Sequence, residues 1–245
     1  MNTPESGSDH PSRRHVLRTA LAGSAGLALA PLAASAEDLG RGVPARGLEG
    51  AGPLRGTRPT DPDEALARLM AGNERFVSGN MQGVGRDLAR IQQLTEGQRP
   101  FAAILGCADS RVPVEILFDE GFGDIFTVRV AGNVATPEEI ASLEYAVAVL
   151  GTQLIVVLGH SECGAVAAAR AGGEVPGQIS ALFQHILPSI EDDSSLPEAV
   201  EANVGYQVRA LSRASTVISR ALEEGTVAVR GAVYQLTDGR VRLTV

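Results

Sequence analysis

Apolar residues recur along this chain in two patterns, one typical of buried strands and the other of amphipathic helices. Short unbroken apolar runs at 101–105 and 154–158 predict buried strands that are covered on both faces, and the stretch at 125–130 is a further strand candidate. Between and after these runs, apolar positions three and four residues apart predict helices. The predicted helices span 62–77, 137–150, 164–171, 178–190 and 197–224.

Two of these helices carry clear signals at their amino ends. Asp61 suits the N-cap position, Pro62 suits the first helical position, and Glu64 lies three residues after the cap. Thr136 and Pro137 begin a later helix in the same way. These capping residues define the first residue of each helix more precisely than the apolar periodicity alone.

Strands that alternate with helices predict the fold class. This order is typical of an α/β fold in which helices cover both faces of a mainly parallel central sheet. An alternating stretch at 226–236 adds a fourth strand, and 241–245 is its predicted hairpin partner, a C-terminal extra strand.

The first 59 residues differ in character from the rest of the chain. Paired arginines, Arg13 and Arg14, precede a mildly apolar stretch at 19–32, and the triplet at 34–36 has the small-x-small pattern of a cleavage site. This arrangement resembles a twin-arginine export signal, and glycines and a proline interrupt the apolar stretch, which argues against a membrane anchor. The sequence therefore predicts an export signal at 1–36, a Gly/Pro-rich linker at 37–59 and a single domain at 60–245. We expect export to the periplasm or the medium, and no stable membrane insertion after cleavage.

Composition and charge exclude several classes of function. The 245 residues carry a formal net charge of −8, and an acidic chain without a basic face is a poor nucleic-acid binder. The chain contains arginine but no lysine, which removes Schiff-base and P-loop lysine chemistry. Since there are only two cysteines and four histidines, the positions of these soft metal ligands are informative.

Three of these potential ligands follow predicted strands. Cys107 comes after the run at 101–105, and His160 and Cys163 come after the run at 154–158. Sites in open α/β sheets form beyond the carboxyl ends of the strands, and two thiolates with one imidazole suit a catalytic Zn²⁺ that keeps one coordination position open. If they hold one ion per chain, those two strands are neighbours and the strand at 125–130 lies outside the first. The predicted local strand order is 2-1-3-4.

A carboxylate and a guanidinium lie beside the first cysteine. Arg111 can pair with Asp109 in a bidentate fashion, which keeps the carboxylate ionised. Beside a zinc-bound hydroxide, Asp109 would accept a hydrogen bond and orient the attacking lone pair. If Arg111 released it, Asp109 would become a fourth zinc ligand and close the site.

Other interpretations of the two cysteines stay open at this stage. Two cysteines in an exported protein often form a disulfide, but a disulfide requires neither His160 nor Asp109. A structural zinc site prefers four closed Cys or His ligands, and only three are available without Asp109. A redox dithiol protein is a further alternative, which thiol titration with and without a chelator distinguishes.

The two halves of this constellation together resemble a known family. Cys107-x-Asp109-Ser110-Arg111 with His160-x-x-Cys163 is similar to the motif of the β-class carbonic anhydrases, and the similarity extends from about residue 63 to the C-terminus. The resemblance implies a zinc lyase that hydrates carbon dioxide reversibly to bicarbonate and a proton by zinc-hydroxide attack, and a homodimer or higher homo-oligomer. It assigns the zinc ligands to Cys107, His160 and Cys163, and the catalytic pair to Asp109 and Arg111.

The resemblance also implies substrate-binding residues. Gln98 corresponds to the family's active-site glutamine, and Phe126, Ala131 and Tyr145 correspond to its apolar or aromatic pocket. In such dimers Gln98, Phe126 and Tyr145 serve the partner's site. Two alternatives use the same zinc site: hydrolysis of carbonyl sulfide or carbon disulfide, and non-catalytic binding of zinc or bicarbonate.

Overall fold

The structure is a computed structural model and describes residues 57–245. The predicted export signal at 1–36 and most of the predicted linker at 37–59 lie outside the described residues. Among the residues it describes, no helix is both long and apolar enough to cross a membrane. The helices and strands are α1 (Pro62–Val77), α2 (Leu88–Gln93), β1 (Ala102–Gly106), α3 (Val114–Leu117), β2 (Ile125–Arg129), the 3₁₀ helix η1 (Ala131–Asn133), α4 (Pro137–Ala148), β3 (Leu154–His160), α5 (Gly164–Ala171), α6 (Ser180–Ile186), the 3₁₀ helix η2 (Leu187–Ser189), α7 (Leu196–Ala214), α8 (Thr216–Glu223), β4 (Ala228–Tyr234) and β5 (Val241–Leu243).

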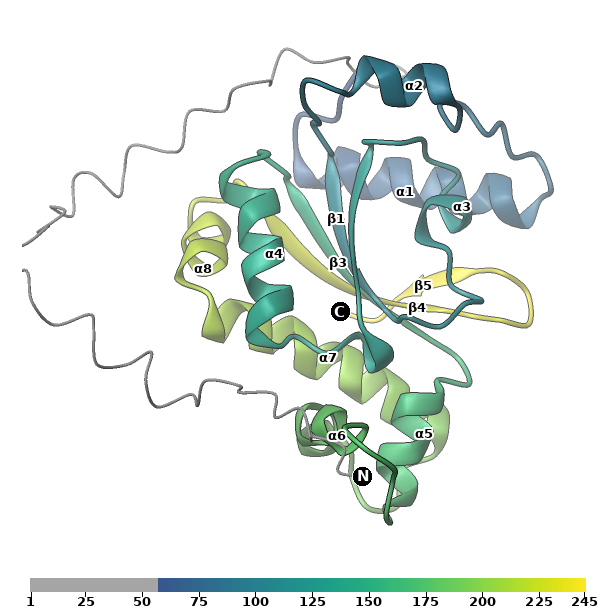
Figure 1. The fold of residues 1–245 in the computed structure, drawn as a ribbon, viewed down its shortest axis with the longest axis vertical. Helices are drawn as coiled ribbons and strands as arrows, with labels where there is room; N and C mark the ends of the chain where they lie inside the picture. The colour runs from purple at the N-terminus through teal and green to yellow at the C-terminus, as the bar shows by residue number, and fades with distance from the viewer. Residues whose placement is uncertain (1–56) are drawn as a thin grey trace, which may run out of the picture. The chain divides into compact units, whose positions relative to one another are not determined.

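Five strands form one sheet in the order β2-β1-β3-β4-β5 (Figure 1). The first four strands run parallel, and β5 pairs antiparallel with β4. The register places Gly106 of β1 beside both Arg129 of β2 and Leu158 of β3, so these strands reach the same edge of the sheet. The predicted α/β class, the local order 2-1-3-4 and the C-terminal extra strand are confirmed.

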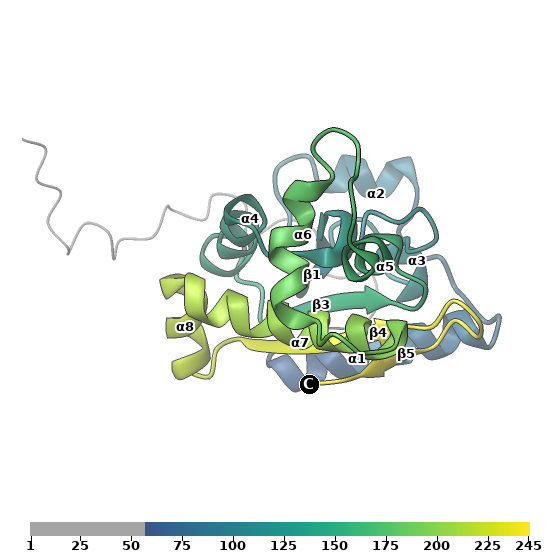
Figure 2. The same ribbon diagram turned by 90° about the horizontal axis from the view of Figure 1, so that it is seen from below.

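Both faces of the sheet are covered, which explains the unbroken apolar runs. Successive strand residues point to opposite faces. Leu105 and Val157 belong to a buried cluster that includes side chains of α4 to α8, whereas Ile104 and Leu158 belong to a second cluster with α1 and α3. Figure 2 shows α1 on one side of the sheet and α4 and α6 on the other. Every position of β1 and β3 is therefore buried.

The helices differ from the prediction at two junctions and in two short segments. The helix predicted at 178–190 is α6, which begins at Ser180, followed by the 3₁₀ helix η2, which contains Pro188. The helix predicted at 197–224 is two helices, α7 and α8, which meet at Ser215. Ser215 has extended backbone angles, accepts a hydrogen bond from the N–H of Ile218 (3.0 Å) and donates to Glu144 (2.6 Å). Its side chain therefore caps α8 and interrupts the helical pattern. No pattern predicts α2 and α3, because six and four residues are too few to show periodicity.

Buried ionic contacts anchor α1 to the segment between α3 and β2. Asp119 and Glu120 are fully buried in this segment. Arg68 of α1 donates to both carboxylate oxygens of Glu120 (3.0 and 2.6 Å), and Arg75 donates to Asp119 (2.7 Å). Charge-assisted bonds of this kind have strict geometry, so they set where α1 crosses the sheet.

Candidate metal centre

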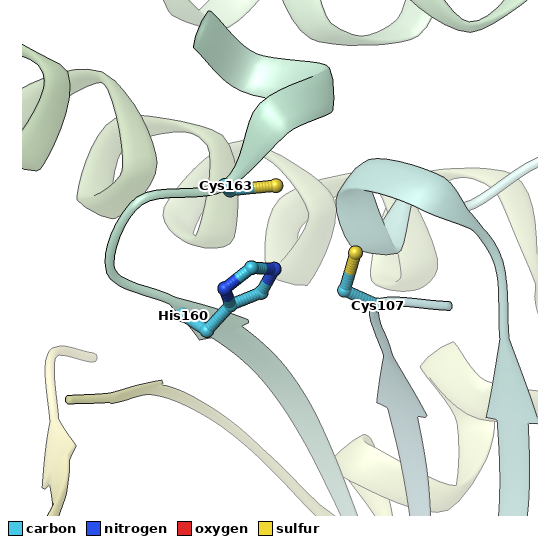
Figure 3. Close-up of side chains that lie close together, drawn as sticks. All are labelled: Cys107, His160 and Cys163. Atoms are coloured by element: carbon cyan, nitrogen blue, oxygen red, sulfur yellow. The ribbon is translucent and has the colours of Figure 1, made fainter. Parts of the chain in front are cut away.

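Three potential metal ligands converge at the carboxyl edge of the sheet, and their sulfurs and imidazole point into the same space (Figure 3). Cys107 follows β1, His160 ends β3, and Cys163 is the N-cap of α5. Their ligand atoms all lie within 4.8 Å of one another. The three residues are 4%, 0% and 1% exposed, and both cysteines are free thiols. The predicted ligand set is therefore assembled without a disulfide.

The imidazole of His160 is oriented by a backbone carbonyl. Nδ1 lies 2.9 Å from the oxygen of Ser161, so we assign the ring proton to Nδ1, which donates to this oxygen. Nε2 is buried and has no hydrogen-bond partner within residues 57–245. Burial disfavours the imidazolium, but Cys107, the Ser161 carbonyl and Asp109 together outweigh burial and raise the pKa of His160. A metal ion and a proton therefore compete for Nε2.

A hydrogen bond between the two cysteines shifts the pKa values of their thiols in opposite directions. A hydrogen bond from Cys163 is the main reason why the pKa of Cys107 lies well below its usual range, and the N–H of Gly132, 3.4 Å from the sulfur, acts in the same direction. The same Cys163–Cys107 hydrogen bond, together with burial, raises the pKa of Cys163. Cys107 is therefore the more acidic of the two thiols. Because metal ligands are thiolates and neutral imidazoles, a divalent ion would displace the thiol protons.

The donor set fits zinc. Two sulfurs and one imidazole nitrogen are soft ligands, which magnesium and calcium avoid and zinc accepts. Three protein ligands match a zinc centre that keeps one position for solvent or substrate. The buried, unpaired Nε2 of His160 agrees with this assignment, since a buried acceptor without a partner is otherwise costly.

Asp109 borders the centre and is held by Arg111. Its Oδ1 accepts from the backbone N–H (2.8 Å) and Nε (3.0 Å) of Arg111, and its Oδ2 accepts from Nη2 (2.7 Å). These hydrogen bonds hold the pKa of Asp109 far below its ordinary value. Asp109 Oδ2 lies 3.9 Å from His160 Nε2, and Arg111 also donates to the carbonyl of Glu162 (3.3 Å). The predicted pair is therefore formed, and it connects the loops that carry the three ligands.

Arg129 fixes the loop that carries Cys107, and sequence reasoning missed it. It ends β2, donates through Nε to the carbonyl of Cys107 (2.9 Å) and through Nη2 to the carbonyl of Asp109 (2.6 Å). The only signal in the sequence is an arginine near the end of a predicted strand, which is equally typical of a solvated strand end. The strand register that places it beside Gly106 is needed to see its role.

The four predicted pocket residues lie at different places in one chain. Ala131 begins η1, next to Gly132, whose N–H faces Cys107. Phe126 is the second residue of β2, and its ring centroid is 6.3 Å from that of Tyr145 on α4. The Tyr145 side chain is 48% exposed. Gln98 is exposed in the segment that precedes β1, at the end of the strand opposite to Cys107.

A family model described as carbonic anhydrase matches residues 102–241, more than half of the chain. Among curated proteins, "Carbonic anhydrase 2" of Mycobacterium tuberculosis is 42% identical over 193 residues, which cover 75% of this chain and 93% of that protein. The "Carbonic anhydrase" of Mycolicibacterium smegmatis is 43% identical over 193 residues and is covered to 94%.

Solved structures give the same result for the fold. The β-carbonic anhydrase CcaA matches with a TM-score of 0.58 and 26% identity, over 73% of this chain and 86% of that one. The β-carbonic anhydrase CafA of Aspergillus fumigatus matches with a TM-score of 0.56 and 29% identity, over 73% of this chain and 89% of that one. The sheet order and the ligand geometry therefore agree with a relationship that sequence and structure detect independently.

Proposed function

Because the chain belongs to the β-class carbonic anhydrase family, we propose that its metal centre binds one zinc ion and hydrates carbon dioxide reversibly to bicarbonate and a proton. The observation that carries the proposal is the convergence of Cys107, His160 and Cys163, whose ligand atoms lie within 4.8 Å of one another. When bound, zinc acidifies a water molecule and so supplies a nucleophile near neutral pH.

Asp109 and Arg111 orient the attack in this proposal. Because Arg111 keeps Asp109 ionised, the carboxylate can only accept hydrogen bonds. Oδ2, 3.9 Å from His160 Nε2, accepts a hydrogen bond from the attacking oxygen and turns a lone pair toward the carbon of the substrate. Closure of the site by Asp109 as a fourth ligand would require this carboxylate to leave its three hydrogen bonds from Arg111.

We propose that the working unit is a homodimer in which each chain completes the partner's pocket. Gln98 precedes β1 and Cys107 follows it, so the length of a five-residue strand separates them in one chain, on the order of 15 Å. An amide this far away cannot bind a substrate at its own zinc centre. The exposed ring of Tyr145, beside Phe126, is an apolar surface that a second chain would cover.

Zinc content and carbon dioxide hydration, measured on the same preparation, test the proposed function. We expect about one zinc ion per chain, and stopped-flow turnover from about pH 6.5 to about 9, around the pKa near 7 of zinc-activated water. A chelator should abolish turnover and added zinc should restore it. Faster turnover of carbonyl sulfide or carbon disulfide than of carbon dioxide would favour the hydrolase alternative, and bound zinc without any turnover would favour the non-catalytic one.

We propose that the chain is exported before it acts. The support is the pair Arg13 and Arg14 ahead of the apolar stretch at 19–32 and the triplet at 34–36. In a host with a twin-arginine pathway, we expect the exported protein to begin at Glu37. Lysine at both arginine positions should leave the uncut chain inside the cell, and an exported, shortened product from that variant would contradict the proposal.

A further inference from the structure

Two amide side chains on α7 contact the turn that faces the metal centre, and no step of the proposed reaction uses them. We propose that Asn203 and Gln207 are positioning residues of the zinc centre, which hold the turn at 131–135 so that the N–H of Gly132 points at the Cys107 sulfur. The inference rests on the proposed function, because it concerns how the same site holds zinc.

The turn contacts the proposed ligand Cys107 through Gly132, and glycine has little backbone preference of its own. The Gly132 N–H lies 3.4 Å from Cys107 Sγ. Gly132 has φ +78°, a backbone conformation that strains other residues, and a Cβ there would also lie 3.3 Å from Ala165 Cβ, so the position favours glycine. Asn133 also has a positive φ, of 46°. Since Gly132 adopts many backbone conformations and Asn133 occupies one that is sparsely populated for asparagine, surrounding contacts must fix the direction of this N–H.

Asn203 and Gln207 provide those contacts. Asn203 Nδ2 donates to the carbonyl of Gly132 (2.9 Å), and Gln207 Oε1 accepts from the N–H of Ala135 (3.0 Å). Gln207 Nε2 donates to Asn203 Oδ1 (2.9 Å) and to the carbonyl of His185 (2.9 Å). The two amides therefore hold the turn at both ends and hold each other.

The helix that carries these amides also packs against the strand that carries His160. A Cβ on Gly159 would lie 2.6 Å from Val204 Cγ2, so α7 contacts β3 directly beside the histidine. Val204 is the neighbour of Asn203 in α7. The helix α7 thus sets the distance between the turn at Gly132, which contacts Cys107, and the end of β3, which carries His160.

The two amides are buried, so they are not surface groups that contact only water. Asn203 and Gln207 are each 1% exposed, and apolar residues would fill these positions without the cost of desolvating four polar atoms. A backbone N–H directed at a metal-bound sulfur withdraws charge from it and fixes its orientation. Groups that orient metal ligands in this way typically change metal affinity by about 10- to 100-fold when they are removed.

The test is the zinc affinity of Asn203→Leu, measured on the full, demetallated chain by competition with a chromophoric chelator. We expect zinc to bind about 10- to 100-fold more weakly than to the unmodified chain. In the cobalt-loaded form, the sulfur-to-cobalt charge-transfer absorption should shift, since the environment of one thiolate changes. Gln207→Met should change both quantities in the same direction, and it decides the question if Asn203→Leu does not fold.

Asn73→Leu is the matched control, because Asn73 is a buried asparagine that bridges backbone groups on the opposite face of the sheet. It is 4% exposed, donates to the carbonyls of Leu117 (3.2 Å) and Gly239 (2.9 Å), and accepts from the N–H of Val241 (2.9 Å). Its loss should lower stability and leave zinc affinity and the cobalt spectrum unchanged. The inference is overturned if the α7 variants bind zinc within about twofold of the unmodified chain, or if Asn73→Leu weakens zinc equally. Failure of the unmodified chain to bind zinc would instead refute the proposed function.

Discussion

His160→Ala is expected to lose zinc and, with it, all measurable hydration of carbon dioxide. The three protein ligands leave no spare donor, because Asp109 is engaged by three hydrogen bonds from Arg111. Removal of an outer group around a metal costs up to about 100-fold in affinity, and removal of a ligand costs more. Two cysteines would remain, and two protein ligands are one fewer than the three that a catalytic zinc site provides.

Elemental analysis and stopped-flow assays on the purified variant check this result, and His185→Ala is the matched control. His185 is the other histidine in the described part of the chain, and it lies on α6. Only its backbone carbonyl takes part in the contacts around the turn at 131–135, and alanine keeps that carbonyl. His185→Ala should therefore retain zinc and turnover. Stoichiometric zinc in His160→Ala would show that the three-ligand centre is wrong.

The ligand residues could be predicted from sequence because their placement is local. Cys107 and His160 each lie two residues after an apolar run, Cys163 lies three residues after His160, and the carboxyl ends of parallel strands meet at one edge. If one ion binds all three residues, the strands that precede Cys107 and His160 must be neighbours. The strand at 125–130 must then lie at the edge, next to the strand at 101–105, and the observed sheet has this order. Asp109 and Arg111 could be predicted for the same reason, since they lie in the loop that begins at Cys107.

The supporting residues could not be predicted, because they act on backbone groups far away in the sequence. Asn203 and Gln207 bind groups about seventy residues before them, and Arg129 binds the loop of a neighbouring strand. One signal was present for α7. Gln207 occupies a place in an apolar spacing with Val200, Val204 and Leu211, all of which are buried, so an amide stands where the pattern calls for an apolar side chain. A polar residue at a core position indicates a buried partner but does not say which one.

Asp109→Ala is expected to keep zinc and to lose about 100-fold or more of its turnover of carbon dioxide, the lower end of what a positioned acid–base group contributes. The side chain is not among the three ligands that converge, so the metal is held without it. Its Oδ2 is the acceptor beside His160 Nε2, and without it nothing in this loop orients the attacking oxygen. Arg111→Ala should have the same effect on turnover, because Arg111 makes the hydrogen bonds that hold Asp109 in place.

Asp238→Ala is the control for these two variants, since it removes a second aspartate–arginine pair with the same spacing. Asp238 accepts from the backbone N–H of Arg240 (3.0 Å), and its Oδ2 lies 3.9 Å from Arg240 Nε, in the hairpin between β4 and β5. Loss of an exposed pair of this kind changes stability little, so zinc content and turnover should both stay unchanged. Zinc content separates a catalytic from a structural role at the metal centre: turnover that falls only in proportion to lost zinc would assign Asp109 to metal retention. Full turnover in Asp109→Ala and Arg111→Ala would remove the pair from the mechanism.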